Sequence, residues 1–296
     1  MPNYNPDDRQ CQQFLGKNLP HYHKIWLNTD IHTPGQTDWT DEFEYLGLSD
    51  TDFPGKNVLD IGALDGVHSF NAERLGAKRV LAVDVEDVED YDWGYAGPPG
   101  RLKGKGEIKN RVFQELKTFF ASNVERQRLT VYELKPEEVG QFDIVFFYGV
   151  LYHLRHPLLA FDRIRPVCRD MICVETHVAK IDPALPYSFF YLEDELDGAC
   201  TNWTGPSEAC VVHWMKDAGF EKIYYEKKPA RDRRQKFIGF VDKDRVVNDA
   251  MQLNFSLADE EYFQRSRQQV LQRIKPDHPR KTSIKKRIRK LLKPLK

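Results

Sequence analysis

The fold is decided by the stretch Val58-Leu59-Asp60-Ile61-Gly62-Ala63-Leu64-Asp65-Gly66. Its apolar start, from Asn57 to Ile61, predicts a buried strand, and the spacing of residues 69–75 predicts a helix directly after the turn. A second apolar run over 79–84 predicts another strand, which ends in Asp84. A strand, a glycine-containing turn, a helix and a second strand ending in an acid are typical of nucleotide-binding α/β domains.

The charges of this turn indicate which nucleotide it binds. The dinucleotide fingerprint G-x-G-x-x-G is absent, and Asp60 stands two positions before the first glycine. A carboxylate there repels a pyrophosphate but not the cationic amino end of S-adenosylmethionine, while Asp84 can accept the ribose hydroxyls. The alternative is a turn in an α/β protein that binds no nucleotide. The predicted cofactor-binding residues of this part are Asp60, Gly62, Ala63, Leu64, Asp65, Gly66 and Asp84.

The rest of the chain alternates predicted strands and helices. This order indicates an α/β, Rossmann-like, doubly wound and mostly parallel sheet of seven strands. The five later strands are expected at 129–132, 142–147, 171–175, 222–226 and 236–241. We divide the chain into an N-terminal extension (1–56), a cofactor-binding domain (57–245), a helical segment (246–278) and a basic amphipathic tail (279–296).

A second stretch carries a resemblance to a known family. The run Phe142-Asp143-Ile144-Val145-Phe146-Phe147-Tyr148-Gly149-Val150-Leu151-Tyr152-His153-Leu154-Arg155-His156-Pro157, taken with residues 58–68, resembles class I S-adenosylmethionine-dependent methyltransferases. It looks most like the branch that modifies the tRNA wobble uridine. The resemblance implies methyl transfer on a Rossmann-like domain. The tRNA-acting member uses a carboxylated cofactor and a basic N-terminal region; no such basic segment precedes residue 57, so plain methyl transfer is our expectation.

Candidate reacting groups follow the fourth and fifth predicted strands, at the edge where open α/β sheets bind ligands. We assign His153 as the general base or acceptor-orienting group and Tyr152 as a wall of the methyl-transfer pocket. Glu175 is a second candidate base, whereas we expect His177 to be exposed on the surface. A structural histidine and a packing tyrosine are the alternatives for His153 and Tyr152.

Three further residues are assigned to the cofactor. Tyr132 and Glu133 end the predicted third strand, near the expected adenine, and Tyr148 ends the fourth. Leu64 departs from the family, which usually has glycine at this position. The aromatic residues Trp93, Tyr95 and Trp203 lie in irregular segments that we expect to overhang the site, where they can stack on a planar acceptor.

Charge is distributed unevenly along the chain. Residues 279–296 hold nine Lys or Arg and no Asp or Glu, so removing this +9 from the net charge of −1 leaves about −10 for residues 1–278. An acidic body is a poor surface for nucleic acid, whereas the basic tail suits an anionic membrane surface or RNA. No apolar run is long enough to span a bilayer, and no metal site is predicted. We therefore expect a cytoplasmic protein, at most weakly peripheral to a membrane.

These observations leave three functions open. The leading one is an S-adenosylmethionine-dependent methyltransferase for a small-molecule or glycan-like acceptor, reacting at oxygen. The alternative is a tRNA wobble-uridine modifying methyltransferase. The third is a non-catalytic S-adenosylmethionine-binding protein, which the Leu64 departure favours.

Overall fold

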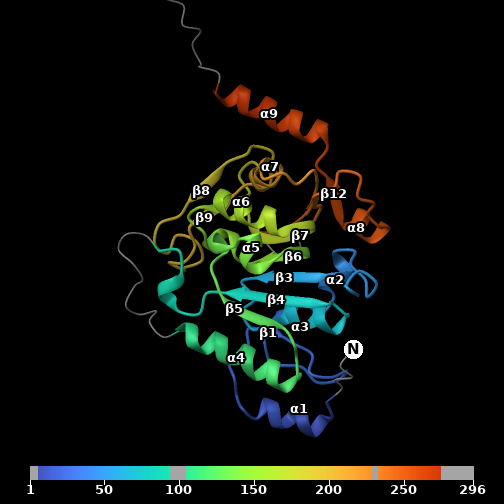
Figure 1. Ribbon diagram of the computed structural model, residues 1–296. Coiled ribbons are helices and arrows are strands. Elements are labelled where there is room, and N and C mark those ends of the chain that lie inside the picture. The colour runs from blue at the N-terminus through green and yellow to red at the C-terminus, as the bar shows by residue number, and fades with distance from the viewer. Residues whose placement is uncertain (1–5, 94–104, 229–232, 275–296) are drawn as a thin grey trace, which may run out of the picture.

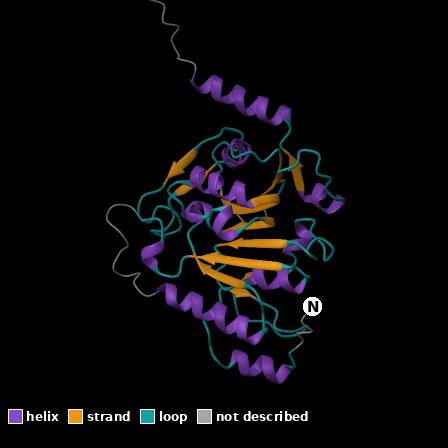
Figure 2. Ribbon diagram, viewed as in Figure 1, coloured by secondary structure: helices purple, strands orange, loops and turns teal. Residues whose placement is uncertain are grey.

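The protein is built around one large sheet that runs through its centre (Figures 1 and 2). The computed structural model describes residues 6–93, 105–228 and 233–274. The eight strands lie in the order β12-β10-β11-β7-β6-β3-β4-β5. Their bounds are β3 Asn57–Ile61, β4 Arg79–Asp84, β5 Glu125–Arg128, β6 Phe142–Tyr148, β7 Cys168–His177, β10 Lys222–Glu226, β11 Arg234–Phe240 and β12 Phe255–Leu257.

Strand pairing confirms the α/β class and corrects the strand count. Strands β5, β4, β3, β6 and β7 are parallel, and β11 is antiparallel to β7. Strand β10 is antiparallel to β11, which returns it to the common direction. Six of these seven strands match the expected ones, and β5 takes the place of the strand expected at 129–132. The eighth, β12, adds to the edge by pairing antiparallel with β10, so the prediction of seven was one strand short.

The predicted third strand at 129–132 is wrong. Strand β5 spans Glu125–Arg128 and pairs with β4 as the polar edge of the sheet. The apolar residues that follow form a 3₁₀ turn, Val131–Glu133, capped by mutual hydrogen bonds between Thr130 and Glu133. An edge strand exposed on one side needs few apolar residues, which is why hydrophobicity pointed to the wrong segment.

Helices cover both faces of the sheet, as the doubly wound prediction requires. On one face lie α3 (Val67–Arg74), α4 (Lys105–Phe119) and α8 (Asp249–Asn254). On the other lie α5 (Pro136–Val139), α6 (Pro157–Val167), α7 (Glu208–Asp217) and α9 (Glu260–Ile274). Side chains alternate along each strand, so Phe146 points into the first core and Phe147 into the second.

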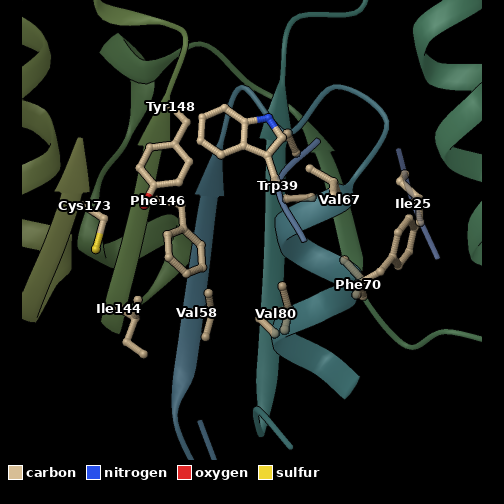
Figure 3. Close-up of a cluster of buried hydrophobic side chains, with 14 of the residues drawn as sticks. Ile25, Trp39, Val58, Val67, Phe70, Val80, Ile144, Phe146, Tyr148 and Cys173 are labelled. Carbon is tan, nitrogen blue, oxygen red and sulfur yellow. The ribbon is translucent and has the colours of Figure 1, made fainter. Parts of the chain in front are cut away.

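The N-terminal extension belongs to the first core. It contains α1 (Asp8–Leu15), the short parallel pair β1 (His23–Lys24) and β2 (Thr37–Asp38), and α2 (Glu42–Tyr45). Figure 3 shows Trp39 of this extension beside Tyr148 at the end of β6; the two rings stack with centroids 5.7 Å apart. Because Ile25, Trp39 and Phe53 are buried with the strands, the extension is part of the folded body.

Two predicted features remain to be placed. The basic tail, 279–296, and Tyr95 lie outside the described residues.

A small antiparallel pair, β8 (Ser188–Phe190) and β9 (Thr204–Pro206), forms within the irregular stretch that follows β7. In the part of the chain that the structure describes, no helix is both long and apolar enough to cross a membrane.

Candidate functional site

The turn after β3 has the geometry of a ligand cradle. Gly62 has a φ of +75°, and its N–H donates to Val83 O at 2.8 Å. A Cβ on Gly62 would lie 2.3 Å from the Val150 side chain, so only glycine fits there. Ala63 is buried against the same carbonyl, and Gly66, with a φ of +88°, is the N-cap of α3. The positive φ values of the two glycines therefore set the backbone of the turn at the carboxyl edge of the sheet.

Asp60 supplies negative charge to this cradle from below. Its carboxylate is 2% exposed and accepts a 2.6 Å hydrogen bond from the Ser69 hydroxyl. Burial, with a further contribution from the charge of Asp84, raises the pKa of Asp60 to about 6. The group is therefore mostly ionised at pH 7, and its burial leaves its electric field, and not direct contact, as the way it can act on a ligand.

Asp84 lies at the end of β4, beside the same turn. One carboxylate oxygen accepts the N–H of Leu64 at 2.7 Å, and the other accepts the N–H of Val85 at 2.8 Å. Each oxygen of a carboxylate has two lone pairs, so both retain capacity for a ribose hydroxyl. Leu64 has a left-handed φ of +52°, a conformation that glycine adopts without strain.

Asp65 is committed to the N-terminal extension. Its carboxylate accepts the backbone N–H of His23 at 2.9 Å and that of Tyr22 at 3.2 Å, and it also contacts the His23 ring. Only the backbone of Asp65 therefore remains to line the cofactor turn. The contact places Tyr22 at the edge of the sheet where ligands bind.

The side chains of the remaining predicted cofactor residues have their partners outside the turn. Tyr132 donates to Asp92 at 2.5 Å, and Glu133 is exposed and caps Thr130. Tyr148 is buried beneath Trp39, and burial raises the pKa of its hydroxyl. A hydrogen bond joins the turn to Asp84, whereas Tyr148 ends the strand beside β3 with its ring packed into the first core.

A pocket of about 490 Å³ opens at the carboxyl ends of β6 and β7. Residues from the N-terminal extension, the turn after β6, the stretch after β8 and the start of β11 line it. They are Tyr22, Tyr152, His153, His177, Leu196, Asp197, Ala199, Asn202, Arg233 and Arg234. This is the edge of the sheet at which the cofactor turn lies, so the pocket can admit an acceptor next to a bound nucleoside.

His153 and Tyr152 line the pocket from a 3₁₀ turn, Leu151–His153. The Nδ1 of His153 lies 2.8 Å from Thr201 O, and because a carbonyl only accepts, Nδ1 carries the proton. In the neutral ring the basic lone pair is then on Nε2. Tyr152 packs against His153, and burial raises the pKa of its hydroxyl, so it remains protonated. Of the two, only His153 has the chemistry of a base.

Glu175 lies behind the pocket and is held by Arg234. Both Nε and Nη2 of Arg234 donate to the two carboxylate oxygens at 2.5 Å, and Glu175 is 1% exposed. The Arg234 guanidinium in turn lies 4.6 Å from the centre of the Tyr152 ring. Both carboxylate oxygens of Glu175 accept from Arg234, so the geometry favours a role for Glu175 in holding Arg234.

The expectation that His177 is exposed is wrong. The side chain lines the pocket but is 4% exposed, and its Nε2 lies 3.3 Å from the Tyr191 hydroxyl. Burial lowers the pKa of His177 to about 4, so it is neutral at pH 7. The end of β7 is covered by the stretch around Tyr191, which hydrophobicity did not reveal.

Several pocket residues were missed from the sequence. Arg234 had one detectable signal: Glu175 inside an apolar strand requires a cation, and β11 pairs with β7. Tyr22 and Asn202 reach the pocket only through tertiary packing. Asn202 is 6% exposed, and its Oδ1 has no hydrogen-bond partner among the described residues. Those residues also contain no group of three side chains able to hold a metal ion.

Comparisons with known proteins agree with this geometry. No protein-family model matches the sequence. The N-terminal domain of EvdMO1, crystallised with S-adenosylhomocysteine and D-fucose, superposes with a TM-score of 0.54 at 19% identity, covering 82% of this chain and all of that one. The same domain with S-adenosylhomocysteine bound gives a TM-score of 0.52. The chain therefore shares the fold of this domain, which was crystallised with S-adenosylhomocysteine.

Curated relatives confirm the resemblance read from the sequence. The tRNA U34 carboxymethyltransferase of Chromohalobacter salexigens is 26% identical over 223 residues, which are 73% of this chain and 59% of the relative. The enzyme of the same name from Colwellia psychrerythraea is 27% identical over 216 residues, 70% of this chain and 59% of the relative. The chain therefore spans less than two thirds of the length of these relatives.

Proposed function

We propose that the chain binds S-adenosylmethionine on the turn after β3 and transfers its methyl group to an acceptor in the 490 Å³ pocket. The observation that carries the proposal is the placement of Asp60, Asp84 and this pocket along one edge of the sheet. The buried carboxylate of Asp60 favours the cationic amino end of the cofactor. Asp84 keeps acceptor capacity for the ribose hydroxyls.

When bound, the cofactor supplies a methyl group on a positively charged sulfur. The chain's own residues position the acceptor and take its proton. His153, with its Nδ1 proton held by Thr201 O, presents Nε2 as the base. Arg234, fixed by Glu175, and Asn202 offer hydrogen-bonding groups that can orient a polar acceptor in the pocket.

For the acceptor, the comparisons favour RNA over the small-molecule or glycan-like acceptor that we expected from the sequence. The relatives named for tRNA U34 match 73% and 70% of this chain. We therefore propose a uridine of tRNA as the first acceptor to test. Arg233, exposed at the rim of the pocket, is placed to meet a phosphate.

A neutral polyhydroxyl acceptor, such as a sugar, is a second candidate because of the charge beside the pocket. Asp197 lines it, and Glu193, Asp194 and Glu195 precede it in the chain, so this side repels a polyanion. An aromatic ledge adjoins it, where Phe190, 51% exposed, stacks on Trp203. Aromatic rings and carboxylates are groups that can contact the apolar faces and hydroxyls of sugars.

The test is a turnover assay with S-adenosylmethionine labelled in its methyl group. Bulk tRNA, tRNA digested to nucleosides, and a panel of simple sugars and glycans are offered separately, and S-adenosylhomocysteine is measured in each. Label in tRNA supports the first acceptor, and label in a sugar supports the second. Binding of the cofactor with no turnover on any of these acceptors would support a non-catalytic binding protein.

A further inference from the structure

Arg126 lies directly beneath the proposed nucleoside site. It is the second residue of β5, and its side chain crosses to the turn after β3, where Nη1 donates to Leu64 O at 3.1 Å. The guanidinium packs on the ring of Phe113, 4.4 Å from its centre. The side chain is 3% exposed, so it is covered by the turn and does not itself reach a ligand.

Leu64 is held in place by two polar groups. Its N–H donates to Asp84, and its carbonyl accepts from Arg126. The left-handed conformation of a residue with a Cβ costs roughly 1 kcal/mol or more, which glycine would avoid. The two hydrogen bonds offset this cost. They also make Leu64 a link between the two side chains, because its N–H binds Asp84 and its carbonyl binds Arg126.

The guanidinium also acts on Asp84 through space. Its Nη2 lies 3.8 Å from an Asp84 oxygen, and its Nε lies 3.8 Å from an oxygen of Glu86. Neither nitrogen has a hydrogen-bond partner among the described residues. A buried charged donor left without a partner is unfavourable. The fold keeps this arrangement at the residue that would bind the ribose, where a fixed positive charge orients the carboxylate.

We infer that Arg126 is a positioning residue for the nucleoside site, which acts through Leu64 and Asp84 to set the preference for a ribose with both hydroxyls. The inference rests on the proposed function, because it assumes that Asp84 binds the ribose of S-adenosylmethionine. It also explains how the turn tolerates leucine where the family usually has glycine. The hydrogen bond from Arg126 to Leu64 O stabilises the left-handed backbone that glycine would adopt without strain.

The experiment measures the dissociation constants of S-adenosylhomocysteine and of its 2′-deoxy analogue by calorimetry. The wild-type protein should prefer the ribose form by roughly tenfold or more, because a hydrogen bond to a charged carboxylate is lost with the hydroxyl. In Arg126→Met the preference should fall to roughly twofold, because Asp84 is no longer oriented. The matched control is Arg128→Gln on the same strand, where Arg128 pairs with Asp87 and Asp90 at the surface. It should keep the wild-type ratio.

Two more variants separate positioning from folding. Leu64→Gly in the Arg126→Met background should restore part of the preference, because glycine adopts the turn without support. Arg126→Lys keeps the charge but loses the fork of donors, so its ratio should fall between those of the wild type and Arg126→Met. If Arg126→Met does not fold, the ratio of the two dissociation constants in Arg126→Lys tests the inference by itself.

The outcomes are distinct. If the wild-type protein binds neither nucleoside, the proposed function fails. If the wild type prefers the ribose form and either Arg126 variant keeps the same preference, the inference about Arg126 is overturned while the proposed function stands.

Discussion

Arg234 and Glu175 form a bidentate ion pair, with both hydrogen bonds at 2.5 Å, between the neighbouring strands β11 and β7. Through it, a carboxylate buried inside the sheet fixes a guanidinium on the wall of the pocket. Arg234→Met should lower the free energy of unfolding by about 3–5 kcal/mol, because it leaves Glu175 buried and unpaired. Chemical denaturation measures this loss.

The matched control is Lys216→Met, which removes one partner of the exposed Lys216–Glu221 pair. This substitution should lower the free energy of unfolding by less than about 1 kcal/mol. Replacing both buried partners, in Arg234→Met with Glu175→Leu, should recover most of the stability. Equal, small losses in Arg234→Met and Lys216→Met would contradict the account of a buried pair.

Asp84→Ala should weaken S-adenosylmethionine binding at least tenfold, because it removes the acceptors for the ribose hydroxyls. Asp84→Asn keeps one oxygen acceptor for the Leu64 N–H, so its affinity for S-adenosylmethionine should lie between those of the wild type and Asp84→Ala. Calorimetric titration of the three proteins gives the dissociation constants, and thermal unfolding checks that each is folded. Unchanged affinity in Asp84→Ala would remove this carboxylate from the site.

Asp60 predicts a pH dependence with a definite sign. Its pKa is raised by burial from 3.8 to about 6 in the folded protein, so its contribution to the free energy of unfolding falls as pH rises from about 4 to 6. Cofactor affinity should rise between about pH 5 and 7, because the carboxylate gains its charge there while the amino group of the cofactor stays cationic. Calorimetry between pH 5 and 7.5 measures the affinity. Asp60→Asn should flatten the profile, and a flat wild-type profile would refute the electrostatic role.

His153→Gln should lower turnover by roughly 10²- to 10⁴-fold with little change in cofactor affinity. Glutamine can still donate to Thr201 O, but it has no basic nitrogen. The control is His156→Gln, at an exposed position three residues on, which should retain activity. If His153→Gln turns over as fast as the control, His153 is a structural residue.

Gly66→Ala should lower the free energy of unfolding by about 1–3 kcal/mol. A Cβ there would lie 2.6 Å from the Phe70 ring and 2.7 Å from the Phe113 ring, in a backbone with positive φ. Gly55→Ala is the matched control, because Gly55 also has positive φ but a Cβ there meets nothing within 4 Å. The difference between the two in chemical denaturation measures the steric part. Equal losses would show that only the backbone conformation matters.

The sequence was sufficient for features that depend on neighbours along the chain. The strand over 57–61, its glycine turn and the acid at the end of β4 were placed correctly because a buried parallel strand is a continuous apolar run.

Features that depend on distant segments were not readable. Tyr22 reaches the pocket because Asp65 binds its backbone, a contact across 43 residues. His177 is buried because the stretch around Tyr191 covers it. Edge strand β5 escaped detection because its polar residues carry no periodic apolar signal.

The central claim is that a buried acid below the turn and a second acid beside it select a positively charged nucleoside over a pyrophosphate. Calorimetric titration of the purified protein with S-adenosylmethionine and, separately, with NAD tests it most directly. The account predicts saturable binding of S-adenosylmethionine and no measurable heat with NAD. Tight binding of NAD, with no response to S-adenosylmethionine, would contradict it.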